Sequence, residues 1–311
     1  QVVQFRDFPE DEVLQSIADA DQEMIDNGIV AVGDISNKTD TAATKERSPI
    51  HYYSFVDMFD LMQSEMTGAI FSQYAEVYKK QSATNGNRKN VVPHAPYSVS
   101  PMLFSKMAEL QDTNGTVSIH NQETPDEDQF FLKKKGGLIN FYQNMGLKLD
   151  QFNATGKTAI HFAMENMNPS VKTLFVHNTM TRRSDIQAAQ SWNPQVYWAT
   201  CPNANLYIEN KLPDYEEFLS EGAKMTIGTD SLTSNWQLCI LDEMRTIQKF
   251  KSGLDFHELL KWATINGAEA LGYDDVLGSF DKNKTPGVNL IQIEDIENGI
   301  NMAKASVHKL A

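Results

Sequence analysis

Hydrophobic and polar positions follow one repeating order along the chain: a short β-branched run that ends in a polar residue, then an amphipathic stretch. Short runs of this composition are typical of buried strands, and apolar residues three or four positions apart are typical of helices. The pattern predicts seven strands, at residues 29–34, 50–55, 90–94, 116–120, 173–177, 196–200 and 225–230.

Predicted helices precede the strands or separate nearly all of them. In the first, Leu14, Ile17 and Ile25 recur at helical spacing, and Gly28 follows as a glycine at a helix C-terminus does. The predicted helices span residues 11–27, 101–111, 183–190, 213–220, 236–250 and 256–271. Because each strand-then-helix unit returns the chain to the same end of the sheet, we expect the strands to be parallel.

Seven such units indicate an α/β fold, either a (β/α)₈ barrel of the TIM type or a doubly wound sheet. No Gly-rich dinucleotide-binding motif follows any predicted strand, which favours the barrel. We expect residues 1–277 to form this barrel. Residues 286–293 predict one further strand, so we interpret 278–311 as the C-terminal segment of a small accessory β-sandwich.

Length and charge narrow the class of protein. The 311 residues suffice for one barrel of about 250 residues. A net charge of −14, with no stripe of Lys or Arg, argues against nucleic acid or a membrane as partner and leaves a small-molecule substrate compatible. Two cysteines, Cys201 and Cys239, argue against a disulfide scaffold, so we expect a reducing, cytoplasmic location.

Four polar residues fall at the ends of separate predicted strands: His94, His120, His177 and Asp230. In a parallel barrel these ends open on one face, where active sites lie. Imidazole nitrogens and carboxylate oxygens suit Zn²⁺ or another divalent transition metal. A single His after a strand is more often an ordinary hydrogen-bonding loop residue, and Asp230 alone could be a helix N-cap. All four together favour a site.

Glu123 adds a second kind of group, because it lies three residues beyond His120, just past a predicted strand end. A carboxylate beside an activated water can take its proton and pass it to a leaving group. The alternative is a surface acid in an acidic loop, since residues 126–128 are all acidic.

Five short segments at or just after the predicted strand ends form an ordered set of motifs: 92–101 (VPHAPYSVSP), 120–123 (HNQE), 175–178 (FVHN), 201–206 (CPNANL) and 228–231 (GTDS). Together they resemble the strand-end motifs of the amidohydrolase superfamily. The resemblance is to the branch of adenosine and S-adenosylhomocysteine deaminases, which is related to cytosine deaminases and chlorohydrolases, and it covers roughly residues 11–293.

The resemblance implies metal-dependent hydrolytic deamination of an adenosine-type purine nucleoside, of the S-adenosylhomocysteine, methylthioadenosine or aminodeoxyfutalosine class. In that reaction a metal-bound hydroxide attacks the ring carbon that bears the amino group, and ammonia leaves. His120 and Asp230 are then implied metal ligands.

Further roles follow from the same resemblance. Glu123 is implied to shuttle protons, with help from Asp230 in activating the water. His177 is implied to hold the attacking hydroxide. His94 and Ser234 are implied contacts to the substrate.

The chain departs from the family pattern at the first strand, where the family has a His-x-His pair that supplies two metal ligands. No His-x-His occurs in this sequence, and Gln1 falls after the expected position of that strand. We therefore expect a barrel that lacks its first strand in this chain because an N-terminal piece is missing. Catalytic zinc normally has three protein ligands, so we also expect the chain as it stands to hold metal weakly or not at all.

Three alternatives stay open. The first is a chlorohydrolase-type or other amidohydrolase that acts on a different ring substituent. The second is a metal-free, non-catalytic relative that binds a small molecule. The third, a phosphate-binding barrel, would need a Gly-rich loop after the last two strands, and the segment after Asp230 has none. A homodimer is compatible with each.

Overall fold

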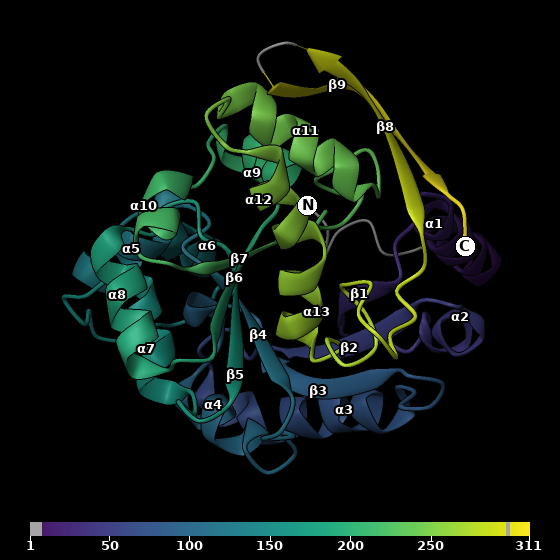
Figure 1. Cartoon of the computed structure of the whole chain (residues 1–311). Helices are drawn as coiled ribbons and strands as arrows, with labels where there is room; N and C mark the ends of the chain where they lie inside the picture. The colour runs from purple at the N-terminus through teal and green to yellow at the C-terminus, as the bar shows by residue number, and fades with distance from the viewer. Residues whose placement is uncertain (1–7, 297–298) are drawn as a thin grey trace.

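Seven parallel strands alternate with helices in the computed structural model, which describes residues 8–296 and 299–311 (Figure 1). The strands are β1 (Ala31–Ser36), β2 (His51–Met58), β3 (Arg88–Pro93), β4 (Thr116–Asn121), β5 (Lys172–His177), β6 (Val196–Thr200) and β7 (Lys224–Ile227). They form two parallel sheets, β1-β2-β3 and β4-β5-β6-β7. The predicted strand order is confirmed, and each predicted end agrees to within three residues.

Helices precede, separate and follow the strands along the chain. They are α1 (Glu10–Asp26), α2 (Ala42–Arg47), α3 (Thr67–Lys80), α4 (Pro101–Met107), α5 (Pro125–Lys133), α6 (Gly137–Asn144), α7 (Ala159–Asn166), α8 (Arg183–Trp192), α9 (Pro202–Glu209), α10 (Tyr215–Ser220), α11 (Ile240–Phe250), α12 (Phe256–Ala263) and α13 (Ile265–Leu271). The predicted helix 256–271 is two helices. Within the described ranges no helix is long and apolar enough to cross a membrane.

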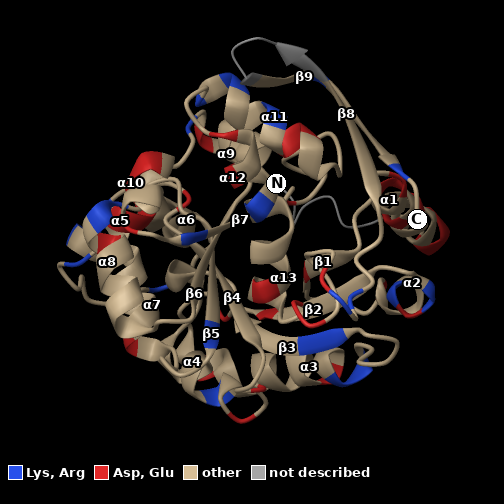
Figure 2. Cartoon of the chain, in the orientation of Figure 1, with Lys and Arg blue, Asp and Glu red and all other residues tan. Residues whose placement is uncertain are grey.

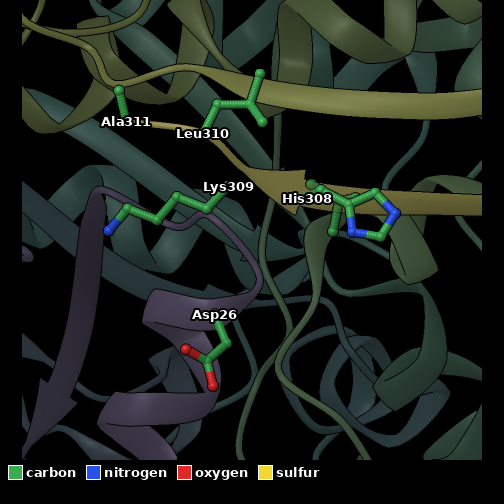
Figure 3. Close-up of a pocket in the computed structure, with 6 residues that line it drawn as sticks. Asp26, His308, Lys309, Leu310 and Ala311 are labelled. Atoms are coloured by element: carbon green, nitrogen blue, oxygen red, sulfur yellow. The ribbon is translucent and has the colours of Figure 1, made fainter.

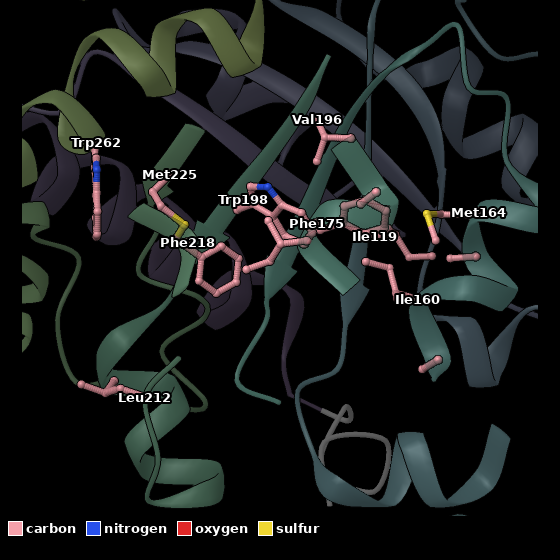
Figure 4. Close-up of a cluster of buried hydrophobic side chains, with 14 of the residues drawn as sticks. Ile119, Ile160, Met164, Phe175, Val196, Trp198, Leu212, Phe218, Met225 and Trp262 are labelled. Atoms are coloured by element: carbon pink, nitrogen blue, oxygen red, sulfur yellow. The ribbon is translucent and has the colours of Figure 1, made fainter. Parts of the chain in front are cut away.

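The main core lies between the strands and these helices. Figure 4 shows Phe175 and Trp198 of neighbouring strands near Phe218 of α10, with Met225 of β7 beside them and Trp262 farther along the same core cluster. Phe175 and Trp198 stack with their ring centroids 5.2 Å apart, and Trp198 meets Phe218 edge-on at the same separation. Burial of such large side chains is the dominant favourable contribution to folding, so this layer fixes the curvature on which the site depends.

Hydrogen bonds join the two sheets where β3 meets β4. The backbone N–H of His120 donates to the carbonyl of His94 (2.9 Å), and the Asn90 side chain donates to the carbonyl of Thr116 (3.1 Å). The seven strands are therefore consecutive members of one curved, parallel arrangement. Its carboxyl ends all open on the same side, which is the geometry that the polar strand ends require.

Helix α13 closes the opposite, amino ends of the strands and lies between the two sheets in Figure 1. Asn266 donates to the carbonyl of Met225 on β7 (2.8 Å), and Thr116 on β4 donates to the carbonyl of Ala270 (2.6 Å). On β1, a Cβ atom added to Gly33 would lie 3.0 Å from Leu271 of α13 and 2.9 Å from Phe55. A larger residue there would force the Phe55 and Leu271 side chains to shift, so glycine suits this close approach of the helix to the strand.

The C-terminal residues form an antiparallel hairpin of β8 (Asn289–Ile296) and β9 (Gly299–Lys309). It packs on α11, where the Arg245 guanidinium donates to the carbonyls of Met302 (3.0 Å) and Ala305 (2.7 Å). A strand at 286–293 was predicted, whereas β9 was not. The division into domains 1–277 and 278–311 stays a prediction, and residues 1–7 and 297–298 within them lie outside the described residues.

Candidate active site at the carboxyl ends of the strands

Three imidazoles form a row along the carboxyl ends of β3, β4 and β5. His94 directly follows β3, His120 lies one residue before the end of β4, and His177 ends β5. The ring centroids of His94 and His120 are 4.7 Å apart, and those of His120 and His177 are 5.4 Å apart. The geometry thus brings together three side chains that are widely separated in sequence.

Each imidazole in the row is anchored through the same ring nitrogen. His120 Nδ1 lies 2.7 Å from the carbonyl oxygen of His94, and His177 Nδ1 lies 2.9 Å from Asn205 Oδ1. Since a carbonyl oxygen only accepts, Nδ1 carries the proton in both rings. His94 Nδ1 likewise lies 2.9 Å from a carboxylate oxygen of Asp57. The Nε2 atoms are therefore the edges left for chemistry.

Burial and neighbouring charges set different protonation tendencies within the row. Burial, followed by the proximity of His94 and His177, lowers the pKa of His120, which favours its neutral form. Burial also opposes protonation of His94, but the Asp57 carboxylate outweighs it and raises the pKa of His94. The central ring thus offers a lone pair, and the first ring is biased towards carrying charge.

Glu123 joins this row from the loop after β4. Its Oε1 atom lies 3.5 Å from Nε2 of His177, and its side chain is 16 % exposed. The buried carboxylate of Glu127 fixes the loop, because it accepts from the backbone N–H groups of Gln122 (3.0 Å), Glu123 (2.7 Å) and Thr124 (3.3 Å). Burial, and then the charge of Glu123, raise the pKa of Glu127 to about 8.

Asp230 and Ser234 form a second group beyond β7. Asp230 accepts from the Ser234 hydroxyl (2.6 Å) and from the backbone N–H of Ser231 (2.7 Å). β7 ends at Ile227, so Asp230 lies in the following loop and not at the strand end that the sequence predicted. Across the described ranges, no hydrogen bond or ion pair connects Asp230 with the histidine row. The charges of Asp230 and Glu123 nevertheless both act on the buried Cys201 thiol.

A buried carboxylate, Glu243 of α11, ties the loops around the site together. It accepts from the side chains of Asn203 (2.8 Å), Asn235 (2.7 Å) and Gln237 (2.8 Å), and from the backbone N–H of Asn203 (2.9 Å). Asn203 lies after β6, and the other two lie after β7. Burial raises the pKa of Glu243 to about 7. One side chain therefore holds the loop of Asp230 against the first turn of α9, the helix that supplies Asn205.

Backbone strain concentrates at the same rim. Gln122, His177, Asn178 and Asp230 all have positive φ angles, of 45°, 73°, 58° and 58°. The left-handed region is unfavourable for side chains other than glycine, and surrounding contacts must hold it. Strain of this kind clusters at functional sites, so its location supports this end of the strands as the working face.

The donor set fits a metal only in part. His120 is arranged as a ligand would be, because its Nδ1–H is fixed on a carbonyl and its Nε2 is left over. Among residues 8–296 and 299–311, however, no group of three or more His, Cys, Asp or Glu side chains is placed to hold an ion. Catalytic zinc normally has three protein ligands, so the described residues supply candidate donors and not a complete site.

Two residues with clear roles at the rim were not predicted from the sequence. Asp57 contacts His94, but the predicted strand ended at Phe55, whereas β2 continues to Met58. An acidic residue within a buried apolar run was the available signal. Asn205 orients His177 and lies within the segment 201–206, where only the motif as a whole was recognised.

A hollow of about 470 Å³ lies elsewhere, against the C-terminal residues. Figure 3 shows Asp26 of α1 on one side of it and His308, Lys309, Leu310 and Ala311 on the other. None of the predicted site residues lines it. The candidate site is therefore the histidine row and its loops, not this hollow.

Comparison with known proteins agrees with the strand-end motifs. A model of the Amidohydrolase family matches residues 4–304. An adenosine deaminase of Helicobacter pylori is 28 % identical over 275 residues, which cover 86 % of this chain and 65 % of that protein. The chain thus spans less than two thirds of the length of that relative.

Solved structures share the fold at low identity. Helicobacter pylori aminofutalosine deaminase in complex with methylthio-coformycin superposes with a TM-score of 0.74 at 24 % identity, over 90 % of this chain and 68 % of that one. Atrazine chlorohydrolase from Arthrobacter aurescens complexed with zinc gives 0.74 at 16 % identity, over 96 % and 69 %. Both are similar to this chain in their α/β-barrel architecture.

Proposed function

The chain belongs to the amidohydrolase family, and from that membership we propose that it takes part in hydrolytic deamination of an adenosine-type purine nucleoside. Water adds to the ring carbon that bears the amino group, the carbon–nitrogen bond breaks, and ammonia leaves. The observation that carries this proposal is the row of three imidazoles, each anchored through Nδ1, with the Glu123 carboxylate beside the last Nε2.

Glu123 and His177 supply the proton transfers in this proposal. Glu123 takes a proton from the attacking water and delivers one to the departing amino group, as a positioned carboxylate can. His177 directs Nε2 to the same place, because Asn205 holds its other nitrogen, and hydrogen bonds the oxygen as it adds. The Glu127 carboxyl, which accepts from the backbone N–H of Glu123, and the left-handed backbone at Gln122 fix the loop that carries Glu123.

His94 and Ser234 contact the substrate in the same proposal. Phe59 and Tyr97 flank the His94 ring at centroid distances of 5.4 and 6.4 Å, so that the ring is held between aromatic neighbours. Ser234 also holds Asp230.

A divalent metal, Zn²⁺ or another transition ion, belongs to the proposal as well. His120 and Asp230 are the donors that this chain would contribute, and the zinc in the chlorohydrolase structure supports that choice of metal. When bound, such an ion lowers the pKa of water towards neutrality. We propose no further ligand, because the described residues offer no third donor in place.

Product analysis tests the proposal directly. The metal-supplemented chain is incubated with adenosine, methylthioadenosine or S-adenosylhomocysteine, and both ammonia and the deaminated nucleoside are measured. We expect equal amounts of both products. Inosine, which has the same ring without the amino group, is the control and should release no ammonia. Absence of ammonia from every amino-bearing nucleoside would contradict the proposed reaction.

Attack on a different ring substituent is the second candidate, and the likeness to atrazine chlorohydrolase favours keeping it. The same groups would serve, since an activated water attacks an electron-poor ring carbon in both reactions. Chloride release from a chlorotriazine without ammonia release from the nucleosides would select this alternative. A small-molecule substrate, the cytoplasmic location and a homodimer remain predictions beside both candidates.

A further inference from the structure

A buried carboxylate behind the histidine row has no structural explanation of its own. Asp57, near the end of β2, is 3 % exposed. Its Oδ2 atom meets His94 Nδ1 at 2.9 Å, whereas its Oδ1 atom is buried and has no hydrogen-bond partner among the described residues. Burying a carboxylate with half of its acceptor capacity unused is costly, and an apolar residue would stabilise the fold more.

His94 connects Asp57 to the next ring in the row. Its side chain bonds Asp57, while its carbonyl oxygen accepts both the backbone N–H (2.9 Å) and the Nδ1–H (2.7 Å) of His120. A change in the orientation of the His94 ring therefore strains the residue that sets the tautomer of His120. Asp57, His94 and His120 are thus one continuous chain of contacts across β2, β3 and β4.

The neighbours of His94 engage its Nδ1 atom and the ring, and no hydrogen bond reaches its Nε2 atom from the residues that the structure describes. Phe59 and Tyr97 pack near the ring, and Asp57 occupies Nδ1. The His94 side chain is 31 % exposed and the Asp57 side chain only 4 %, so solvent reaches the pair mainly through the imidazole. A neutral imidazole in water favours no fixed partner, so a specific acceptor is needed to keep one nitrogen protonated and the other free.

We propose that Asp57 is a positioning residue: it holds the proton of His94 on Nδ1 and thereby turns Nε2 of His94 towards the substrate and steadies His120. In its effect on catalysis this inference rests on the proposed function, because it takes His94 as a contact to the nucleoside. The predicted effect of Asp57 on the tautomer of His94 does not depend on that function. The tautomer and the kinetics are therefore measured separately.

The ring is tested by nuclear magnetic resonance on the full chain labelled with ¹⁵N-histidine. The chain has seven histidines, and the His94 signals are identified by their loss in His94→Gln. At about pH 8.5, above the ordinary imidazole pKa, the nitrogen shifts report which ring nitrogen carries the proton. We expect Nδ1 of His94 to be protonated in the wild type and to lose that proton in Asp57→Leu, which offers no acceptor.

Three further variants separate positioning from folding. Asp57→Asn keeps an acceptor oxygen and should keep the Nδ1–H tautomer. Asp57→Ser is too short to reach the ring and replaces Asp57→Leu if the leucine variant does not fold. Asp60→Asn is the matched control, because Asp60 is also buried in the same segment but accepts from Ser100 and Thr67 instead of His94. It should leave the His94 signals unchanged.

Steady-state kinetics with adenosine test the catalytic part. Loss of one charge-assisted hydrogen bond should raise KM about tenfold in Asp57→Leu, with a smaller effect on kcat, and Asp57→Asn should recover most of it. An unchanged His94 tautomer in Asp57→Leu, or an equal change in Asp60→Asn, would overturn the positioning role. A changed tautomer in a chain that releases no ammonia from adenosine would leave that role intact and count against the proposed function alone.

Discussion

The amino ends and the carboxyl ends of the strands differ in the kind of charged side chain they carry and in whether it has a partner. At the amino ends, each cation has a partner: Lys224 binds Glu269 of α13, Lys172 donates to the carbonyl of Glu269, and Arg88 lies over the Tyr273 ring. Figure 2 shows the blue cationic positions on β3 and β5. At the carboxyl ends, acids and imidazoles gather, an oxygen of Asp57 has no hydrogen-bond partner in the described part of the chain, and the backbone at His177 and Asp230 is strained.

This difference separates what stabilises the fold from what the fold is used for. The amino ends are covered by α13, whose Ala268, Ala270 and Leu271 are buried against the strands. The contacts named there are packing, hydrogen bonds to backbone carbonyls, and charge pairing. The carboxyl ends hold buried polar groups and strained residues that an optimally stable protein would not keep, and such costs are tolerated where they serve chemistry.

The largest expected effect is a loss of catalytic rate when Glu123, at the carboxyl ends of the strands, is replaced. Glu123→Gln keeps the shape of the side chain but removes its ability to accept a proton. We expect kcat for ammonia release to fall by about 10²- to 10⁴-fold, the range typical of a lost general acid–base, with little change in the melting temperature. Steady-state kinetics and thermal unfolding monitored by circular dichroism measure the two quantities.

Glu209→Gln is the matched control for that substitution. Glu209 ends α9, and the charge of Glu123 contributes to raising its pKa, so the same charge is removed close to the same rim. It has no place in the proposed proton transfer and should leave kcat within about twofold of the wild type, because surface changes are usually small. A similar loss in both variants would mean that net charge at the rim, not a proton shuttle, sets the rate.

The sequence predicted the features that depend on local patterns, namely the strands and the polar residues at their ends. Each β-branched run gave a strand, and the polar residue at its end gave His94, His120 and His177 with their common side. These inferences work because parallel topology converts the position within a strand into a position in space. The strand at 225–230 was predicted too long, since the chain leaves the sheet after Ile227 and turns through Asp230 with a positive φ.

The parts that the sequence did not predict depend on contacts between distant segments. The pairs Asp57–His94 and His177–Asn205 are 37 and 28 residues apart, and Glu243 reaches Asn203 from 40 residues away. No periodicity encodes which buried acid faces which imidazole. The sealing of the amino ends by α13 was missed for the same reason, because 256–271 was predicted as one helix and its bend after Ala263 sets where α13 lies.

The second-largest expected effect is a loss of stability at the amino ends of the strands, which α13 covers. Leu271 is 8 % exposed and belongs to the cluster that also contains Tyr53 and Phe55 of β2. Leu271→Ala removes buried methyl groups and leaves a cavity, so we expect the free energy of unfolding to fall by about 2–5 kcal/mol. Urea unfolding measures it, and kcat of the folded enzyme should stay close to the wild-type value.

A leucine on the outer layer provides the control. Leu219 of α10 is 36 % exposed, and Leu219→Ala should cost clearly less than Leu271→Ala because fewer of its atoms are buried. If Leu271→Ala instead abolished activity while leaving stability unchanged, α13 would belong to the site and the division between the two ends would fail.

The smallest expected effect concerns the ion pair between Lys224 and Glu269 at the amino ends of the strands. Glu269 accepts from Lys224 Nζ (2.6 Å) and from the Tyr197 hydroxyl (3.0 Å), and the hydrogen bond from Lys224 lowers the pKa of Glu269. The same bond raises the pKa of Lys224. Because the carboxyl pKa is lower in the folded chain, its contribution to stability is present above the unfolded pKa and is lost as the pH falls through the folded pKa. The lysine contribution is lost as the pH rises through its raised pKa.

Glu269→Gln should therefore destabilise the chain at neutral pH and not in strong acid. The Lys224 side chain is 54 % exposed, so solvent screening limits the loss to under about 1 kcal/mol. Urea unfolding from pH 3 to pH 8 measures the difference from the wild type, which should vanish at the acid end and shrink at high salt. Glu109→Gln, which breaks an exposed pair with Lys106, should show less at every pH. A difference that persists unchanged at pH 3 would mean that Glu269 acts through packing, and the amino ends would then be stabilised by α13 alone and not by paired charge.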